Sequence, residues 1–189
     1  MLKTDKKPMP NRARNLILAT LLFPIPIVIV IPLVLISKYG IEIPETLFWG
    51  YWMAKPMIPL GFGIAGFAVT LFFIEGEGSP APWCPPTKFM VTGPYAYIRN
   101  PMATGMVLIL AAIALLIVSI PIAIWTVIVF VSYTAYYIFV EEPGLQARFG
   151  DQYSEYKANV NRWLPRFPGW TAPWLPVEGE EEADKAEGE

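Results

Sequence analysis

Four long apolar stretches limit what this chain of 189 residues can fold into. They cover residues 16–37, 56–74, 102–118 and 121–140. Each is close to the roughly 20 residues that a helix needs to cross the hydrocarbon core of a membrane. The composition agrees, because 54% of the residues are hydrophobic and only 16% are charged. The sequence therefore predicts an all-α integral membrane protein with about four transmembrane helices.

The distribution of positive charge predicts the orientation of these helices. The N-terminal segment, the loop 75–101 and the region after residue 140 hold twelve Lys and Arg residues, whereas only Lys38 and Lys55 flank the loop between the first two stretches. Cytoplasmic segments are enriched in Lys and Arg, so both termini are expected to be cytoplasmic. Residues 44–53 are short and aromatic, and we expect them to form an interfacial helix or a fifth, re-entrant one.

The composition also excludes several kinds of chemistry. With no histidine and a single cysteine, the chain cannot assemble a His-based or multi-Cys metal site, form an internal disulfide or use histidine as a general base. It has no stripe of basic residues for nucleic acid. The composition therefore leaves membrane lipid as the expected partner, with neither nucleic acid nor metal.

We expect three regions along the chain. Residues 1–74 hold an N-terminal cytoplasmic segment and the first two spans, and the first span should be kinked by its prolines. Residues 75–170 form the candidate catalytic region, with a proline-rich loop, a transmembrane hairpin over 102–140 and an amphipathic helix over 145–160 followed by an extended aromatic segment at the membrane surface. Residues 171–189 form an acidic, disordered tail.

The hairpin brings charged residues from distant parts of the chain together. Because only Ser119 and Ile120 join its two helices, its far ends, which carry Arg99 and the pair Glu141 and Glu142, must lie side by side. Two carboxylates ending a helix oppose its dipole and call for a compensating cation. The simpler interpretation makes Arg99 a positive-inside anchor and the glutamates a helix stop. The convergence at one depth favours a functional site.

A glycine pattern in the second stretch has two interpretations. Gly61, Gly63 and Gly66 match the spacing of a dinucleotide-binding loop, but they lie within a predicted membrane helix and follow no strand. Small residues at this spacing let two membrane helices approach closely, and we expect that packing role. Cys84 has no basic partner pattern around it and is left out of the site.

Two motifs in the C-terminal half resemble a known family. Residues 93–102 read GPYAYIRNPM, and about forty residues later 141–156 read EEPGLQARFGDQYSEY. Their order and spacing resemble the isoprenylcysteine carboxyl methyltransferase family, whose architecture is shared with phospholipid methyltransferases. The resemblance covers about residues 75–167.

The resemblance implies methyl transfer that depends on S-adenosylmethionine, with the cofactor pocket at the cytoplasmic interface. Arg99 and Glu142 are the implied catalytic residues. Asn100 and Ala103 stand where the family has histidine and tyrosine, so we expect a hydrogen bond from Asn100 and a backbone contact from Ala103. The implied cofactor-binding residues are Thr87, Lys88, Phe89, Met90, Tyr95, Asn100, Pro101, Met102, Ala103, Glu141 and Glu142.

The residues present are compatible with this chemistry. Methyl transfer from a sulfonium is an in-line displacement that needs alignment and water exclusion, and a carboxylate acceptor needs an orienting cation such as Arg99 instead of a base. By this resemblance we expect a multi-pass membrane methyltransferase that acts on a lipophilic small-molecule or lipidated acceptor. It should be most like protein-S-isoprenylcysteine carboxyl O-methyltransferase. The alternatives are a phospholipid N-methyltransferase, a related NADPH-dependent sterol reductase architecture, or a membrane scaffold without enzymatic activity.

Overall fold

The computed structural model describes residues 18, 22–40, 49–74 and 89–175. Every regular element in these residues is a helix, in agreement with the predicted all-α fold. The expected cytoplasmic N-terminal segment, the acidic tail from residue 176 on and most of the loop 75–101 lie outside the described residues.

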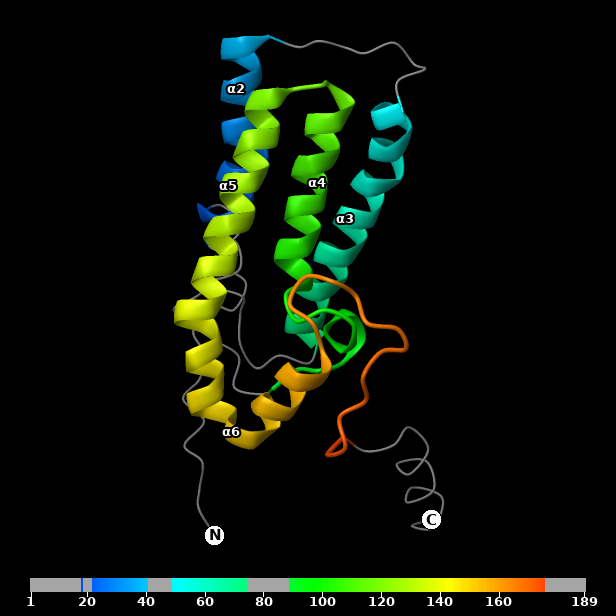
Figure 1. Cartoon of the computed structure of the whole chain (residues 1–189), viewed down its shortest axis with the longest axis vertical. Helices are drawn as coiled ribbons and strands as arrows, with labels where there is room; N and C mark the ends of the chain where they lie inside the picture. The colour runs from blue at the N-terminus through cyan, green and yellow to red at the C-terminus, as the bar shows by residue number, and fades with distance from the viewer. Residues whose placement is uncertain (1–17, 19–21, 41–48, 75–88, 176–189) are drawn as a thin grey trace.

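Four apolar helices form an elongated bundle (Figure 1). They are α2 (Ile31–Tyr39), α3 (Trp49–Ile74), α4 (Pro101–Leu116) and α5 (Ile120–Tyr136). In the bundle, α4 packs between α3 and α5, and α2 contacts α5. The expected irregularity among the first prolines takes the form of a π-helical turn, η1 (Pro26–Val30), which leads into α2. There the carbonyl of Ile27 accepts a hydrogen bond from the indole of Trp125 on α5 at 3.0 Å.

Two of the helical runs are long and apolar enough to cross a membrane, Trp49–Leu71 and Ile120–Asn159. The runs Pro26–Tyr39 and Pro101–Leu116 are apolar but shorter. The expectation of a separate interfacial helix over 44–53 was wrong for residues 49–53, because these residues form the start of α3. Residues 44–48 lie outside the described residues. Near the start of α3, the ammonium of Lys55 lies 4.3 Å from the ring centroid of Trp52 and 4.4 Å from that of Tyr51.

The helices α3 and α4 touch through their backbones at two glycines. A Cβ atom on Gly105 would stand 2.5 Å from the carbonyl oxygen of Gly61 and 2.8 Å from the Cβ of Ala65. A Cβ atom on Gly61 would stand 2.7 Å from Ile109. This confirms the packing interpretation for Gly61, whereas Cβ atoms on Gly63 and Gly66 would meet nothing within 4 Å.

The helical hairpin continues past the predicted end of its second arm. The π-helical turn η3 (Tyr137–Glu141) joins α5 directly to α6 (Glu142–Asn159). Gly150 breaks α6 with φ 54° and ψ −124°, a conformation that favours glycine. Because the helix continues through Glu141 and Glu142, the expected opposition of two carboxylates to a helix C-terminus was wrong.

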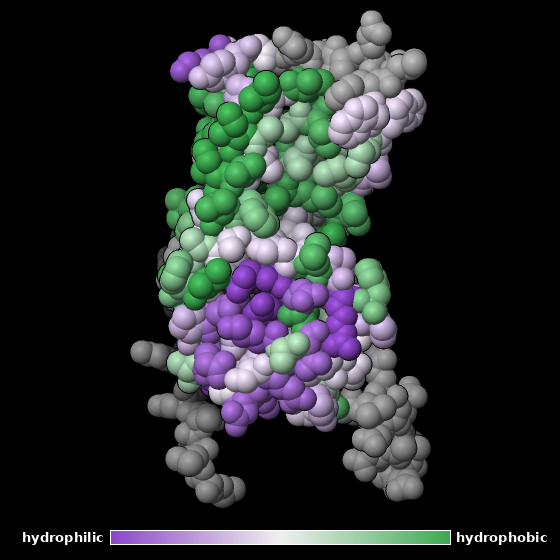
Figure 2. All heavy atoms as spheres, in the orientation of Figure 1, coloured by the Kyte–Doolittle hydropathy of each residue, from purple (hydrophilic) through white to green (hydrophobic). Residues whose placement is uncertain are grey.

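The polar end of the bundle is built from three segments that lie far apart in the sequence. It contains α6, the 3₁₀ turn η2 (Gly93–Ala96) and residues 160–175, which we call the C-terminal strap. The strap accepts a backbone hydrogen bond from Arg99 at Asn161 and donates two, from Arg166 to Tyr97 and from Trp170 to Ala96. Figure 2 shows apolar side chains over the opposite part of the bundle and polar ones gathered at this end.

A small core of its own holds the polar end together. Its buried members come from the segment before η2, from α6 and from the strap: Val91, Tyr153, Tyr156, Val160, Trp170 and Ala172. The turn η2 presses against the end of α3, where a Cβ on Gly93, which has φ +57°, would stand 2.7 Å from Leu71. The GPY motif therefore needs glycine for both conformation and space.

We predict that Gly105→Ala destabilises the protein by about 1–3 kcal/mol, because the added methyl group must push α3 and α4 apart. Thermal unfolding in detergent, followed by circular dichroism, measures the effect. Gly63→Ala is the matched control, since it adds the same methyl group to the interior of α3 with nothing within 4 Å. Equal unfolding temperatures for the two variants would contradict the close approach.

Candidate active site

A cavity of about 70 Å³ opens where the polar end meets the bundle. Its wall is formed by η2 and the segment before it, the residues just ahead of α4, the turn η3, and α6 as far as Tyr156. Seven of the residues predicted from the sequence line it: Phe89, Met90, Tyr95, Arg99, Asn100, Glu141 and Glu142.

Glu142 is the centre of a charge cluster beside this cavity. Its Oε1 atom lies 3.0 Å from Nη1 of Arg99 and 2.7 Å from Nη2 of Arg162, and its Oε2 atom lies 3.1 Å from Nζ of Lys157. The Nε of Arg162 also donates to Oε1, at 2.8 Å. The side chain of Glu142 is only 8% exposed. The sequence predicted a compensating cation for Glu142, and three residues of the chain supply one: Arg99, Lys157 and Arg162.

The cluster sets the protonation state of Glu142. Burial raises its pKa, but the hydrogen bonds from Arg162 and Lys157 and the charge of Arg99 outweigh burial and hold the pKa below its usual value of 4.5. Glu142 therefore stays ionised at neutral pH.

Arg99 joins the charge cluster to the cavity. Its Nη1 atom donates to Glu142, and a longer contact of 3.5 Å reaches the hydroxyl of Tyr153. The side chain is 10% exposed, and its buried Nε atom has no hydrogen-bond partner. The indole nitrogen of Trp163 in the strap is the other buried side-chain nitrogen or oxygen without a partner in the described part of the chain. Arg99 lines the cavity, and a buried donor that has no partner there is a candidate contact for a ligand.

Glu141 differs from its neighbour. Within the described ranges no Lys or Arg lies within ion-pair distance of its carboxylate. The apolar part of the helix ends at Val140, so Glu141 lies just beyond the apolar residues. Burial, partly offset by the charge of Arg148 and reinforced by that of Glu142, raises the pKa of Glu141 to about 7. Both Glu141 and Tyr95 line the cavity, and burial together with the charge of Glu141 raises the pKa of Tyr95.

The opposite wall of the cavity is aromatic. Phe89 stacks on Phe149 with 4.9 Å between ring centroids, and the rings of Tyr153 and Tyr156 meet Phe89 edge-on at 5.9 and 5.3 Å. The hydroxyl of Tyr156 donates to the backbone carbonyl of Tyr95 at 2.8 Å, which ties this wall to η2. The cavity thus combines a buried carboxylate, a buried guanidinium and several aromatic faces.

Three of the remaining predicted residues, Pro101, Met102 and Ala103, do not line the cavity. Pro101 is buried at the first turn of α4, Met102 is half-buried there, and Ala103 packs against Met106 and Tyr137 inside the bundle. Thr87 and Lys88 lie outside the described residues. Ala103 contributes to packing, so the tyrosine-to-alanine departure falls within the helix bundle.

Sequence reasoning missed seven residues of the site. Tyr137, Leu145, Phe149, Tyr153 and Tyr156 line the cavity, and Lys157 and Arg162 hold Glu142. The spacing of Phe149, Tyr153 and Tyr156 on one helix was a usable signal, because residues three and four apart share a helix face. No local pattern marks Arg162, since it reaches Glu142 through the course of the strap.

Comparison with known proteins was made against families, curated proteins and solved structures. The sequence model of the family described as phospholipid methyltransferase matches residues 47–152, which is more than half of the chain. The chain belongs to the phospholipid methyltransferase family. No curated protein and no solved structure gives a significant match.

As a member of this family, the chain is a membrane methyltransferase, and the cavity is its candidate active site. The family match includes α3, η2, α4, α5 and the first half of α6, and so contains Arg99, Glu141 and Glu142. It ends before Lys157 and Arg162, two of the three cations that hold Glu142. In the described residues no group of three or more His, Cys, Asp or Glu is placed to hold a metal ion.

We predict that Glu142→Gln destabilises the protein by on the order of 3 kcal/mol, because it leaves three cations around a neutral, nearly buried amide. The half-exposed Lys157 keeps the loss from being larger. In the wild type, the stabilisation is complete above the usual pKa of 4.5 and is lost as pH falls through the lowered pKa of Glu142. Unfolding in detergent at pH 7 and at pH 4 measures both effects.

The matched control is Glu155→Gln on α6, which removes an exposed carboxylate that forms no ion pair within the described residues. Its stability should stay close to that of the wild type. If the two variants unfold alike, Glu142 does not organise the polar end.

Proposed function

We propose that this protein transfers a methyl group from S-adenosylmethionine to a lipophilic acceptor at the membrane interface. In this proposal the enzyme is most like a protein-S-isoprenylcysteine carboxyl O-methyltransferase. The observation that carries the proposal is the pairing in one cavity of Glu141, which has no cation partner among the described residues, with the unpartnered Nε of Arg99.

The residues of the cavity fit S-adenosylmethionine. This cofactor has an ammonium group, a carboxylate and a sulfonium, and when bound it supplies an activated methyl group. Glu141 would hold the ammonium, and the aromatic faces of Phe89 and Phe149 favour a neighbouring cation. Tyr95 and Asn100 also line the cavity and can add polar contacts to the ligand. A cavity of about 70 Å³ cannot enclose a nucleoside, so part of the ligand must extend beyond it or displace side chains.

In the proposed reaction Arg99 orients the acceptor. Its guanidinium is fixed by Glu142 at one nitrogen and has Nε left to bind a carboxylate oxygen. Glu142 acts through Arg99 and is therefore a positioning residue in this proposal, although the sequence pointed to it as catalytic. A carboxylate acceptor needs no base, so the chain's task is to align the reactants and exclude water.

N-methylation of a phospholipid amine is the second candidate. The family description favours it, and so does the raised pKa of Glu141, about 7, because a carboxylate with that pKa can accept the proton that an amine must lose. A non-enzymatic scaffold and an NADPH-dependent reductase are the remaining alternatives. Titration of the purified protein with S-adenosylhomocysteine and with NADPH distinguishes both from a methyltransferase.

We further propose that α2, α3, α4 and α5 all cross the bilayer, with both termini and the cavity on the cytoplasmic side. The charge distribution supports this orientation, since Arg148, Lys157, Arg162 and Arg166 all lie at or beyond α6. A lipid acceptor would then approach sideways, from the leaflet in which it already resides.

The proposal is tested by methyl transfer from labelled S-adenosylmethionine to a panel of acceptors in the purified, reconstituted protein. The panel contains prenylated cysteine acids, phospholipid amines and a water-soluble thioether acid. We expect a lipophilic acceptor to be methylated fastest. Faster turnover of the water-soluble acid than of every lipophilic compound would contradict the proposed acceptor class.

Within this assay Arg99→Lys reports on the orienting role. Lysine keeps the charge but loses the planar group and its Nε donor, so we expect kcat to fall on the order of tenfold with little change in S-adenosylhomocysteine affinity. Wild-type turnover would make Arg99 a structural anchor.

The affinity for S-adenosylhomocysteine should depend on pH through Glu141. The ionised carboxylate binds the ammonium of the ligand, so protonation below the pKa of about 7 weakens binding, and affinity should rise on the order of tenfold from pH 5.5 to pH 7.5. Isothermal titration at several pH values measures this change. Glu141→Gln should bind more weakly and lose the pH dependence, and a retained pH dependence would assign the titration to another group.

A further inference from the structure

The C-terminal strap reaches unexpectedly far along the bundle. Its residue Trp163 contacts Phe130 of α5 in a tilted arrangement, with 4.7 Å between ring centroids, and meets Tyr137 edge-on at 6.0 Å. Trp163 also packs against the buried cluster of Ala103, Met106 and Tyr137, where α4 and α5 face each other. The strap therefore places an aromatic side chain beside both arms of the helical hairpin.

The two arms give the same depth for this contact. Phe130 lies ten residues after Ile120, the first residue of α5, and Met106 lies ten residues before Leu116, the last residue of α4. At 1.5 Å per residue, both lie about 15 Å from the turn that joins the arms. The hydrocarbon core of a bilayer is about 30 Å thick, so Trp163 reaches the level of its middle.

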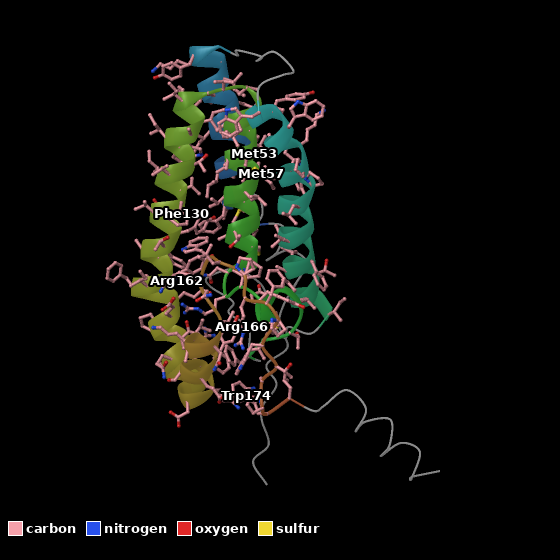
Figure 3. All side chains as sticks on the ribbon, turned by 45° about the vertical axis from the view of Figure 1, so that its right-hand side comes forward. Met53, Met57, Phe130, Arg162, Arg166 and Trp174 are labelled. Atoms are coloured by element: carbon pink, nitrogen blue, oxygen red, sulfur yellow. The ribbon has the colours of Figure 1, made fainter. Side chains whose placement is uncertain are left out.

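The residues that follow Trp163 expose large apolar side chains. Leu164 is 71% exposed and Phe167 is 78% exposed, and Phe167 contacts the ring of Tyr97 on the polar end at 5.6 Å. Two cations lie near this apolar pair in the sequence: Arg162 precedes it and binds Glu142, and Arg166 lies between its members and donates to the carbonyl of Asn159 at 3.0 Å. Figure 3 places Arg162 between Phe130 and Arg166 along the length of the molecule, with Trp174 at the far end.

This arrangement fits one partner. Exposed leucine and phenylalanine beside arginines, in a segment whose Trp163 lies at the level of Phe130 on α5, match the acyl chains and anionic headgroups of a lipid leaflet. On α5, Val131 beside Phe130 in the sequence is 57% exposed. We propose that the C-terminal strap dips into the leaflet on the polar side of the bundle, with Leu164 in the hydrocarbon and Phe167 near the headgroups. This goes beyond the surface-bound segment that the sequence predicts.

The proposal is tested by the depth of nitroxide spin labels in the full chain. Cys84→Ser provides a background without cysteine, and Leu164→Cys and Phe167→Cys are labelled one at a time. Each protein is reconstituted into vesicles of phosphatidylcholine and phosphatidylglycerol. Collision rates with oxygen, which is enriched in the hydrocarbon, are compared with those of a water-soluble nickel chelate. Circular dichroism and gel filtration check that each labelled protein is folded.

Two further positions calibrate the measurement. Val131→Cys on α5 reports a lipid-facing site, and the exposed Glu155→Cys on α6 reports a water-facing one. We expect the ratio of oxygen to nickel collisions at Leu164 to approach that at Val131 and to exceed that at Glu155 by several-fold, with Phe167 in between.

An aqueous signal at Leu164 overturns the proposal. If Val131 reports lipid at the same time, the strap alone stays in water and the embedded hairpin stands. If Val131 is also aqueous, the hairpin does not cross the bilayer and the strap has no leaflet to enter. Neither readout involves methyl transfer, so the failure of this inference is distinguishable from that of the proposed function.

Discussion

The carboxylate of Glu142 connects the parts of the polar end that the backbone leaves separate. Arg99 precedes α4, Lys157 lies near the end of α6, and Arg162 belongs to the strap, and all three point at one nearly buried side chain. A buried ion contributes to stability only if its partners offset the loss of hydration. Here one anion meets three cations, so the surplus positive charge keeps Glu142 ionised. Arg99 is held at the cavity wall, and its Nε has no hydrogen-bond partner.

Adjacent glutamates therefore have different environments. Three cations bind Glu142, whereas Glu141 is partly buried, has no ion-pair partner in the described residues and lines the cavity. A helix turns by about 100° per residue, so neighbours in the sequence point to different surroundings. The distinction matters chemically because a carboxylate whose pKa is near 7 is open to a cationic ligand, while one fixed by three cations is not.

The sequence predicted the helical architecture and the meeting of Arg99 with Glu142, because the short turn at Ser119 leaves a hairpin only one way to fold. It also indicated the close approach at Gly61, since small residues have a recognisable spacing in membrane helices. It missed Arg162, whose position depends on three backbone hydrogen bonds between the strap and the segment 96–99. It could not place Ala103, which packs inside the bundle, because the family motif does not tell which side of the first turn of α4 faces the cavity.

The strap has a consequence for the order in which the protein is made. Synthesis runs from the N-terminus, so α4 and α5 leave the ribosome before Lys157 and Arg162 exist. Until then Glu142 has only Arg99 as a partner, and the backbone amides of Arg99 and the carbonyls of Ala96 and Tyr97 have no strap to bind. The helical hairpin can enter the membrane early, but the site assembles last. A nascent chain thus lacks the complete charge cluster beside the cavity until its C-terminal segment has been translated and folded back onto the bundle.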